Sequence, residues 1–189
     1  MTSLVPQYPH GVGCYIDCGA HPGDTIKNFV DFVDGKYKKI FALELDKKNF
    51  KELKDFVEKN NYKNVELLNC GAWNEKTQLS TANEGMPSAT VSEHGKYTMA
   101  MDTIDNIVGD THVDLIKMDI EGAELKALEG AVKTLKNSRP TLALSSYHRK
   151  EDLITLPQFV KKIYGNCRMY FRKDNFYNLF DFDLYVIPE

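Results

Sequence analysis

The residues with the clearest chemistry stand near the start of the chain, where an acid precedes two glycines. The segment GCYIDCGAHPGDT, residues 13–25, runs from an apolar stretch into Asp17 and then into a turn with Gly19 and Gly23. Glycine lets a backbone approach a ligand closely, and a strand, turn and helix in this order open a nucleotide-type site at the carboxyl end of the strand. His21 lies inside the turn, where it could contact a ligand carboxylate or stabilise the turn itself.

The carboxylate of Asp17 bears on which nucleotide fits this turn. It would repel a dinucleotide pyrophosphate and attract a cationic nucleoside that carries an amino acid. A second acid, Glu44, ends the next apolar segment, KIFALE, where a carboxylate can accept hydrogen bonds from both ribose hydroxyls. The two acids predict S-adenosylmethionine as the cofactor. The rival is an NAD(P)-dependent oxidoreductase, which would need a GxGxxG turn that this segment lacks.

A second polar group, KMDIEGAE at residues 117–124, follows another apolar segment. Lys117 and Asp119 are two residues apart, so they project to the same face of a strand. Since a lysine in a buried parallel strand is costly unless it is paired, we expect Lys117 to contact Asp119 or Asp17. Asp119 ends the strand above the crevice, and Glu121 lies in the turn beyond it.

Several of these residues are candidates for acid–base work. Asp119 could take the proton of an acceptor hydroxyl, with Lys117 orienting it. His148, at the end of a later apolar segment on the neighbouring rim, is the other candidate for the base. Asp119, Glu121 and His148 could also hold a divalent cation, but no tight ligand spacing is visible and we expect metal-free action. Glu124 falls in the first turn of a helix, where negative charge is favoured anyway, so we assign it no role in the site.

The elements that would position these residues alternate between strand and helix. Apolar segments predict parallel strands at residues 14–16, 39–44, 65–68, 113–119 and 141–146. Two aromatic-rich segments, 167–172 and 182–187, predict a closing hairpin. The prediction is an α/β fold with a mostly parallel, seven-stranded Rossmann-like sheet and a C-terminal antiparallel hairpin.

Helical spacing fills the intervals between these strands. It predicts a helix with Ile26 and Phe29 inward, one capped by Asp46, and a short one over residues 101–108 capped near Asp102. Further helices are predicted over residues 123–136 and from Pro157 to Gly165. The pattern loosens over residues 77–101, which predicts strand fragments and an excursion. That segment or residues 173–181 would have to cover the substrate.

Size and charge narrow the class of protein. A chain of 189 residues with 42% hydrophobic content predicts one domain over residues 1–189. The net charge of −3 and the lack of a basic tract give no argument for nucleic acid or an anionic membrane as partner. The four cysteines show no metal-ligand spacing, so we expect reduced structural thiols. With no signal peptide and no long apolar run, the expected location is cytoplasmic.

Five segments resemble, in order, the successive motifs of the FkbM-type S-adenosylmethionine-dependent methyltransferases. They are DCGAHPGDT, FALELD, NCGAW, IKMDIEGAE with LEGA downstream, and SSYHRKEDL, and the resemblance extends over residues 14–186. It implies a class I methyltransferase fold and methyl transfer to oxygen, commonly a hydroxyl of a sugar or a polyketide-like metabolite. Carried over by position, it implies the following contacts: Asp17, Gly19, Gly23 and Glu44 with the cofactor, Asn69 and Cys70 near its adenine, and Asp119 and Glu121 toward the substrate.

The acceptor is therefore expected to be a small molecule or a glycan. Aromatic side chains could stack on a sugar face or form the contact of a homodimer, and the sequence leaves both open. These are Tyr147, Tyr170, Phe176, Tyr177 and Phe180. A non-catalytic domain that keeps the fold as a binding module is the remaining interpretation.

Overall fold

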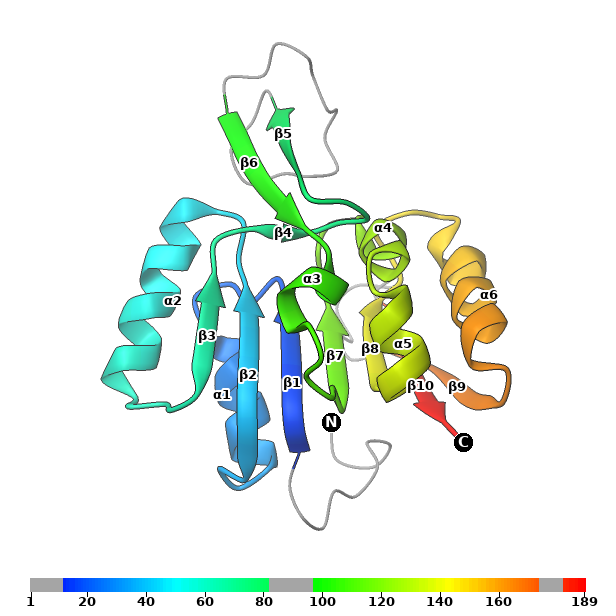
Figure 1. The fold of residues 1–189 in the computed structure, drawn as a ribbon, viewed down its shortest axis with the longest axis horizontal. Coiled ribbons are helices and arrows are strands. Elements are labelled where there is room, and N and C mark those ends of the chain that lie inside the picture. Colours follow the sequence, from blue (N-terminus) through cyan, green and yellow to red (C-terminus); the bar gives the residue numbers. More distant parts are fainter. Residues whose placement is uncertain (1–11, 82–96, 174–181) are drawn as a thin grey trace.

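The computed structural model describes residues 12–81, 97–173 and 182–189. Figure 1 shows a central layer of strands with helices on both of its faces. The elements in chain order are β1 (Val12–Cys18), α1 (Asp24–Phe32), β2 (Tyr37–Leu43), α2 (Lys47–Lys59), β3 (Val65–Leu68), β4 (Gly71–Ala72), β5 (Thr77–Thr81), β6 (Tyr97–Asp102), α3 (Ile104–Val108), β7 (Leu115–Met118), α4 (Glu124–Glu129), α5 (Val132–Ser138), β8 (Thr141–Ser145), α6 (Asp152–Tyr164), β9 (Cys167–Arg172) and β10 (Asp183–Pro188).

Seven strands form the main sheet in the order β3-β2-β1-β7-β8-β10-β9. Neighbours from β3 to β8 pair parallel, whereas β10 is antiparallel to both β8 and β9. The predicted parallel sheet with its C-terminal antiparallel hairpin is therefore confirmed. The chain runs outward from β1 to β3 and then returns to the other side of β1. This reversal opens a crevice at the carboxyl ends of β1 and β7.

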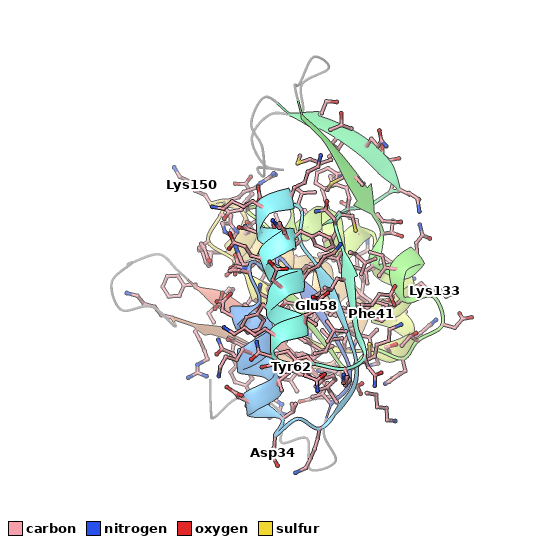
Figure 2. All side chains as sticks on the ribbon, turned by 90° about the vertical axis from the view of Figure 1, so that its left-hand side faces the viewer. Asp34, Phe41, Glu58, Tyr62, Lys133 and Lys150 are labelled. Carbon is pink, nitrogen blue, oxygen red and sulfur yellow. The ribbon has the colours of Figure 1, made fainter. Side chains whose placement is uncertain are left out.

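Each face of the sheet has its own apolar core. On one face, Tyr15 and Ile40 pack with Ile26 of α1 and Leu53 of α2. The opposite face is covered by α3 to α6, whose buried side chains pack on alternate residues of the same strands. In the edge view of Figure 2, Phe41 lies inside the molecule, and Asp34, Lys133 and Lys150 lie at its outside. All four cysteines are free, as predicted.

A second, small sheet stands beyond the carboxyl ends of the main strands (Figure 1). Its order is β4-β6-β5, with β4 parallel and β5 antiparallel to β6. Strand fragments predicted over residues 77–101 are thus confirmed where the chain is described, and residues 82–96 lie outside the described part. The helix predicted over residues 101–108 begins later, at Ile104, because Met101 and Asp102 pair in β6. The side chain of Thr103 caps it by accepting the Asn106 N–H at 3.0 Å.

The single helix predicted over residues 123–136 is wrong, because the chain forms two helices there. Gly130 separates α4 from α5, and a Cβ at Gly130 would lie 1.9 Å from the carbonyl oxygen of Trp73. The carboxylate of Asp105, in α3, then caps α5 by accepting the backbone N–H groups of Lys133 and Thr134 at 2.9 and 2.8 Å. The N-terminus of α5 is thus fixed by a capping side chain from a different helix, α3.

The start of α6 also differs from the prediction, since the helix begins at Asp152 and Pro157 lies within it. Leu156, Val160 and Tyr164 are buried at four-residue spacing, so the stripe that packs on the sheet begins before the proline. The Asp152 carboxylate accepts the Arg149 N–H at 3.0 Å and holds the first turn. Packing thus outweighs the backbone hydrogen bond that the proline removes.

Replacing Asp105 with alanine tests the capping of α5. We expect the D105A variant to lose about 1–2 kcal/mol of unfolding free energy, because the first turn of α5 loses its acceptor. Urea denaturation followed by circular dichroism measures this loss. The matched control is Asp110→Ala, an exposed carboxylate that pairs only at the surface with Lys133. Equal stability of the two variants would contradict the assigned cap.

Candidate active site

An open cavity of about 130 Å³ lies at the carboxyl ends of β1, β2 and β7, where the strand order reverses. Residues from five separate segments line it: Gly19, His21, Leu43–Asp46, Asn49, Cys70–Ala72, Met101, Asp119–Glu121 and Ala123. The cavity therefore gathers the glycine turn, the acid after β2 and the acids after β7 in one place.

The turn after β1 lies close to both neighbouring strands. The backbone N–H groups of Gly19 and Ala20 each donate to the carbonyl of Leu43 at 3.0 Å. Gly19 has a φ of +79°, and a Cβ there would lie 2.1 Å from the carbonyl oxygen of Asp119. Only glycine fits this position, because both the backbone conformation and the space exclude a side chain.

Glu44 provides a fixed carboxylate on the wall of the cavity. Its side chain is buried, and its two oxygens accept the backbone N–H groups of His21 and Asp46, each at 2.8 Å. Asn69 holds the backbone beside it, since its amide donates to the carbonyl oxygens of Glu44 and Leu45 at 2.8 and 3.2 Å. Each carboxylate oxygen keeps further acceptor capacity for a ligand hydroxyl.

Asp17 lies beneath the turn and is not among the lining residues. Its side chain is fully buried on the α1 side of the sheet, where Thr25 Oγ1 donates to it at 2.5 Å. Lys117 Nζ stands 3.1 Å from its other oxygen and donates to the Gly19 carbonyl at 2.6 Å. The expected partner of Lys117 is confirmed as Asp17. Burial lowers the pKa of Lys117, but the carboxylates of Asp17 and Asp119 outweigh burial and raise it above the ordinary value.

The opposite rim of the cavity is acidic. Asp119 follows β7 and accepts the Tyr147 hydroxyl at 3.3 Å. Glu121 stands in the left-handed region with a φ of +57°, and Gly122 follows with +88°. These two residues turn the chain from β7 into α4, and both Asp119 and Glu121 face the cavity.

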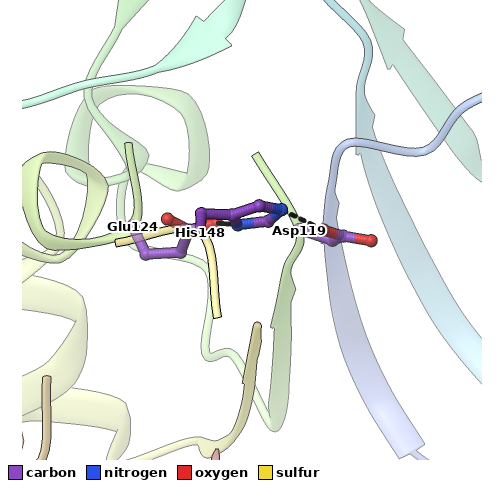
Figure 3. A group of neighbouring side chains, drawn as sticks. All are labelled: Asp119, Glu124 and His148. Carbon is purple, nitrogen blue, oxygen red and sulfur yellow. Dashed lines mark hydrogen bonds and ion pairs between the residues drawn. The ribbon is translucent and has the colours of Figure 1, made fainter. Parts of the chain in front are cut away.

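His148 connects this rim to the buried start of α4 (Figure 3). Its Nδ1 lies 3.0 Å from Glu124 Oε1, and its Nε2 lies 3.5 Å from Asp119 Oδ1 and 3.6 Å from Glu121 Oε2. Burial lowers the pKa of His148, but its hydrogen bond to Glu124 and the three carboxylates outweigh this effect and raise the pKa above 6.5. The imidazole thus lies between a buried carboxylate and two carboxylates at the cavity.

Glu124 is the residue that the sequence interpretation missed. It is fully buried, and Oε1 also accepts the Ile120 N–H at 3.0 Å, whereas Oε2 has no hydrogen-bond partner. The available signal was helical spacing, because Glu124 shares the buried face of α4 with Ala127 and Leu128. A glutamate at a core-facing position needs a partner, and His148 is that partner.

Asp119, Glu124 and His148 each offer a metal-ligand atom within 4.8 Å of the others. The two carboxylates, however, stand at different nitrogens of the ring (Figure 3). An imidazole binds a metal through one nitrogen, so an ion on Nε2 would lie away from Glu124. With the ring in this position, the three residues do not form a single cage around one ion.

The structure thus divides the predicted site residues into two groups. The first group lines the cavity and consists of Gly19, His21, Glu44, Cys70, Asp119 and Glu121. Asp17, Gly23, Asn69, Lys117 and His148 are not among the lining residues and stand behind or beside those that are. Of the aromatic candidates, Tyr147 and Tyr170 are described, and Phe176, Tyr177 and Phe180 lie outside the described residues.

Solved structures with a similar fold include several methyltransferases. Methyltransferase FkbM from Methylobacillus flagellatus KT has a TM-score of 0.79 and 27% identity, over 93% of this chain and 43% of that chain. A candidate methyltransferase from Streptococcus mutans in complex with SAH has a TM-score of 0.59 and 14% identity, over 100% of both chains. An rRNA methylase from Streptococcus thermophilus has a TM-score of 0.57 and 14% identity, over 95% of this chain and 87% of that chain. This chain spans less than half the length of the M. flagellatus protein.

The sheet order, the terminal hairpin and the cavity at the strand ends define a class I methyltransferase fold. The Methyltransferase FkbM domain matches residues 17–176, and the chain therefore belongs to the FkbM methyltransferase family. A search of curated proteins found no match. None of the helices in the described part of the chain has the length and apolar character that a membrane crossing needs.

Removing the charge of Lys117 tests the buried pair beneath the turn. We expect Lys117→Met to lower the unfolding free energy by about 3–5 kcal/mol, because Asp17 would remain buried without its cation. Adding Asp17→Asn should recover part of that loss. Urea denaturation measures both, and Lys126→Met, which removes a half-exposed lysine, is the control. A K117M variant as stable as that control would show that the pair is not needed.

Proposed function

We propose that this chain is an S-adenosylmethionine-dependent O-methyltransferase whose acceptor is a hydroxyl of a sugar, a glycan or a polyketide-like small molecule. The observation that carries the proposal is one cavity with two different walls. Glu44 provides a fixed carboxylate on one side, and Asp119 and Glu121 stand on the other, with His148 behind them. The first wall suits a nucleoside, and the second suits a hydroxyl that must lose a proton.

The cofactor assignment rests on the Glu44 wall and the glycine turn. Two backbone N–H groups fix the carboxylate, which leaves it oriented to accept both ribose hydroxyls. Cys70 lines the same wall and Asn69 supports it, which fits an adenine beside them. A structural neighbour with the same fold was solved in complex with SAH, which supports a cofactor of this kind here.

The acidic rim is suited to the reacting end of this cofactor. A positive sulfonium next to Asp119 and Glu121 is favoured electrostatically. During transfer the S–CH3 bond breaks, its electron pair returns to sulfur, and the acceptor oxygen forms the new bond to the methyl group. Since the methyl group is already activated, most of the acceleration comes from orientation and exclusion of water. The hydroxyl proton passes to Asp119 or His148.

Calorimetric titration tests the cofactor half of the proposal. We expect S-adenosylmethionine and S-adenosylhomocysteine to bind and NAD not to bind. In Glu44→Gln the Kd should rise by about tenfold or more, because a charged acceptor of the ribose hydroxyls is lost. The control is Glu66→Gln, an exposed carboxylate on the neighbouring strand. Binding of NAD alone would overturn the assignment in favour of an oxidoreductase.

Methyl release with a panel of glycans and hydroxylated metabolites tests the reaction half. At least one of Asp119→Asn and His148→Ala should lower kcat by about 10²–10⁴-fold, because a positioned base contributes that much, while the affinity for S-adenosylhomocysteine, which carries no sulfonium charge, stays the same. His112→Ala, which removes an exposed histidine, should leave the rate unchanged. Unchanged turnover in both rim variants contradicts the base, and cofactor binding without transfer to any acceptor favours a binding module.

A further inference from the structure

The imidazole of His148 makes one short contact and two long ones. The 3.0 Å separation of Nδ1 from Glu124 Oε1 is that of a hydrogen bond. The 3.5 and 3.6 Å separations of Nε2 from Asp119 and Glu121 are too long for one. Glu124 is buried and Oε1 also receives the Ile120 N–H, so the carboxylate is held in place behind the ring.

From this arrangement we infer that Glu124 is the positioning residue of the site. It accepts the Nδ1–H of neutral His148 and leaves the lone pair on Nε2, which makes Nε2, rather than the Asp119 carboxylate, the atom that takes the proton of the acceptor hydroxyl. This rests on the proposed function and resolves which of its two candidate bases acts. Neutral imidazole carries a proton on only one of its two nitrogens. A carboxylate beside Nδ1 accepts a hydrogen bond only when that proton is on Nδ1, so Glu124 fixes the Nδ1–H tautomer.

The charges around the ring make Nε2 a stronger base than in a free imidazole. Glu124 from α4 and Asp119 and Glu121 from the loop after β7 stabilise the imidazolium that forms when Nε2 gains the proton. Tyr147 donates to Asp119, and its ring lies tilted by 49° at a centroid distance of 4.4 Å from the ring of His148. Asp152 of α6 and the Cys18 thiol are further titratable groups near Glu124, and Arg149 lies beside Gly122 and near Asp152.

The proton and electrons balance with no further reactant. The acceptor O–H bond breaks as the O–CH3 bond forms, and the proton moves to Nε2. The S–CH3 electron pair stays on sulfur, which becomes the neutral thioether of S-adenosylhomocysteine. His148 returns its proton to water before the next turnover, and the Glu124 carboxylate stays ionised throughout.

Nitrogen NMR of the ¹⁵N-histidine-labelled protein tests the tautomer without cofactor or acceptor. At a pH above the pKa of His148, we expect the Nδ1–H form in the wild type. In Glu124→Leu the Nε2–H form should become populated, because the acceptor behind Nδ1 is gone. An Nε2–H tautomer in the wild type would overturn the inference. A failure of the proposed function is seen separately, as a lack of methyl transfer by the wild type.

The pH profile of kcat/KM tests the role in turnover. His148 must be neutral to act, so the rate should rise with pH through a pKa above 6.5. Glu124→Gln keeps an acceptor for Nδ1–H but removes the negative charge that raises the pKa of His148. The rising part of the kcat/KM profile should therefore move by about one pH unit toward lower pH. Glu124→Leu should lower kcat about 10²–10⁴-fold with little change in the KM of the acceptor.

Two controls separate positioning from a general effect on the fold. Glu129→Gln removes a carboxylate at the other end of α4, where it pairs with Lys126, and should leave the profile unchanged. Mn²⁺ added alone to the wild type should not broaden the His148 resonances at stoichiometric concentration. Selective broadening that disappears in Asp119→Asn would make Nε2 a metal ligand and overturn the inference. A kcat/KM pH profile that does not move in Glu124→Gln would overturn it as well.

Discussion

The buried ion pair of Asp17 and Lys117 is the contact on which both halves of the site depend. The two residues are direct partners across β1 and β7, the strands between which the sheet order reverses. Lys117 also donates to the carbonyl of Gly19, which fixes the turn above the pair. Because an unpaired charge inside a sheet is costly, this arrangement ties the end of β1 to the end of β7. The cofactor turn and the acidic rim therefore share one support.

The two walls of the cavity use carboxylates in different ways. Two backbone N–H groups hold Glu44, so this acid is fixed in place, and in the proposed function it accepts hydrogen bonds from the ribose hydroxyls. Asp119 and Glu121 surround an imidazole that itself rests on Glu124. Their negative charge is compensated when a proton arrives on the imidazole or a sulfonium approaches the rim. The proposed function uses this difference, with a cofactor at one wall and a proton transfer at the other.

Much of this architecture could be predicted, because the strands are short apolar segments and their alternation with helices leaves few topologies. The pairing of Lys117 also followed from the cost of burying it. Asp17 was predicted to contact the cofactor, but its side chain does not line the cavity. Side-chain alternation along β1 places it on the same face as Tyr15, toward α1. The break at Gly130 and the partner of Glu124 depend on contacts with Trp73 and His148, which no local pattern contains.

A crystal structure of this protein with S-adenosylhomocysteine tests the central claim most directly. We predict the ribose hydroxyls on the carboxylate of Glu44 and the sulfur facing the rim of Asp119 and Glu121, with His148 Nε2 directed at the open methyl position. A ligand that leaves this cavity empty, or that points its sulfur away from the rim, would contradict the account and leave only the fold and the family.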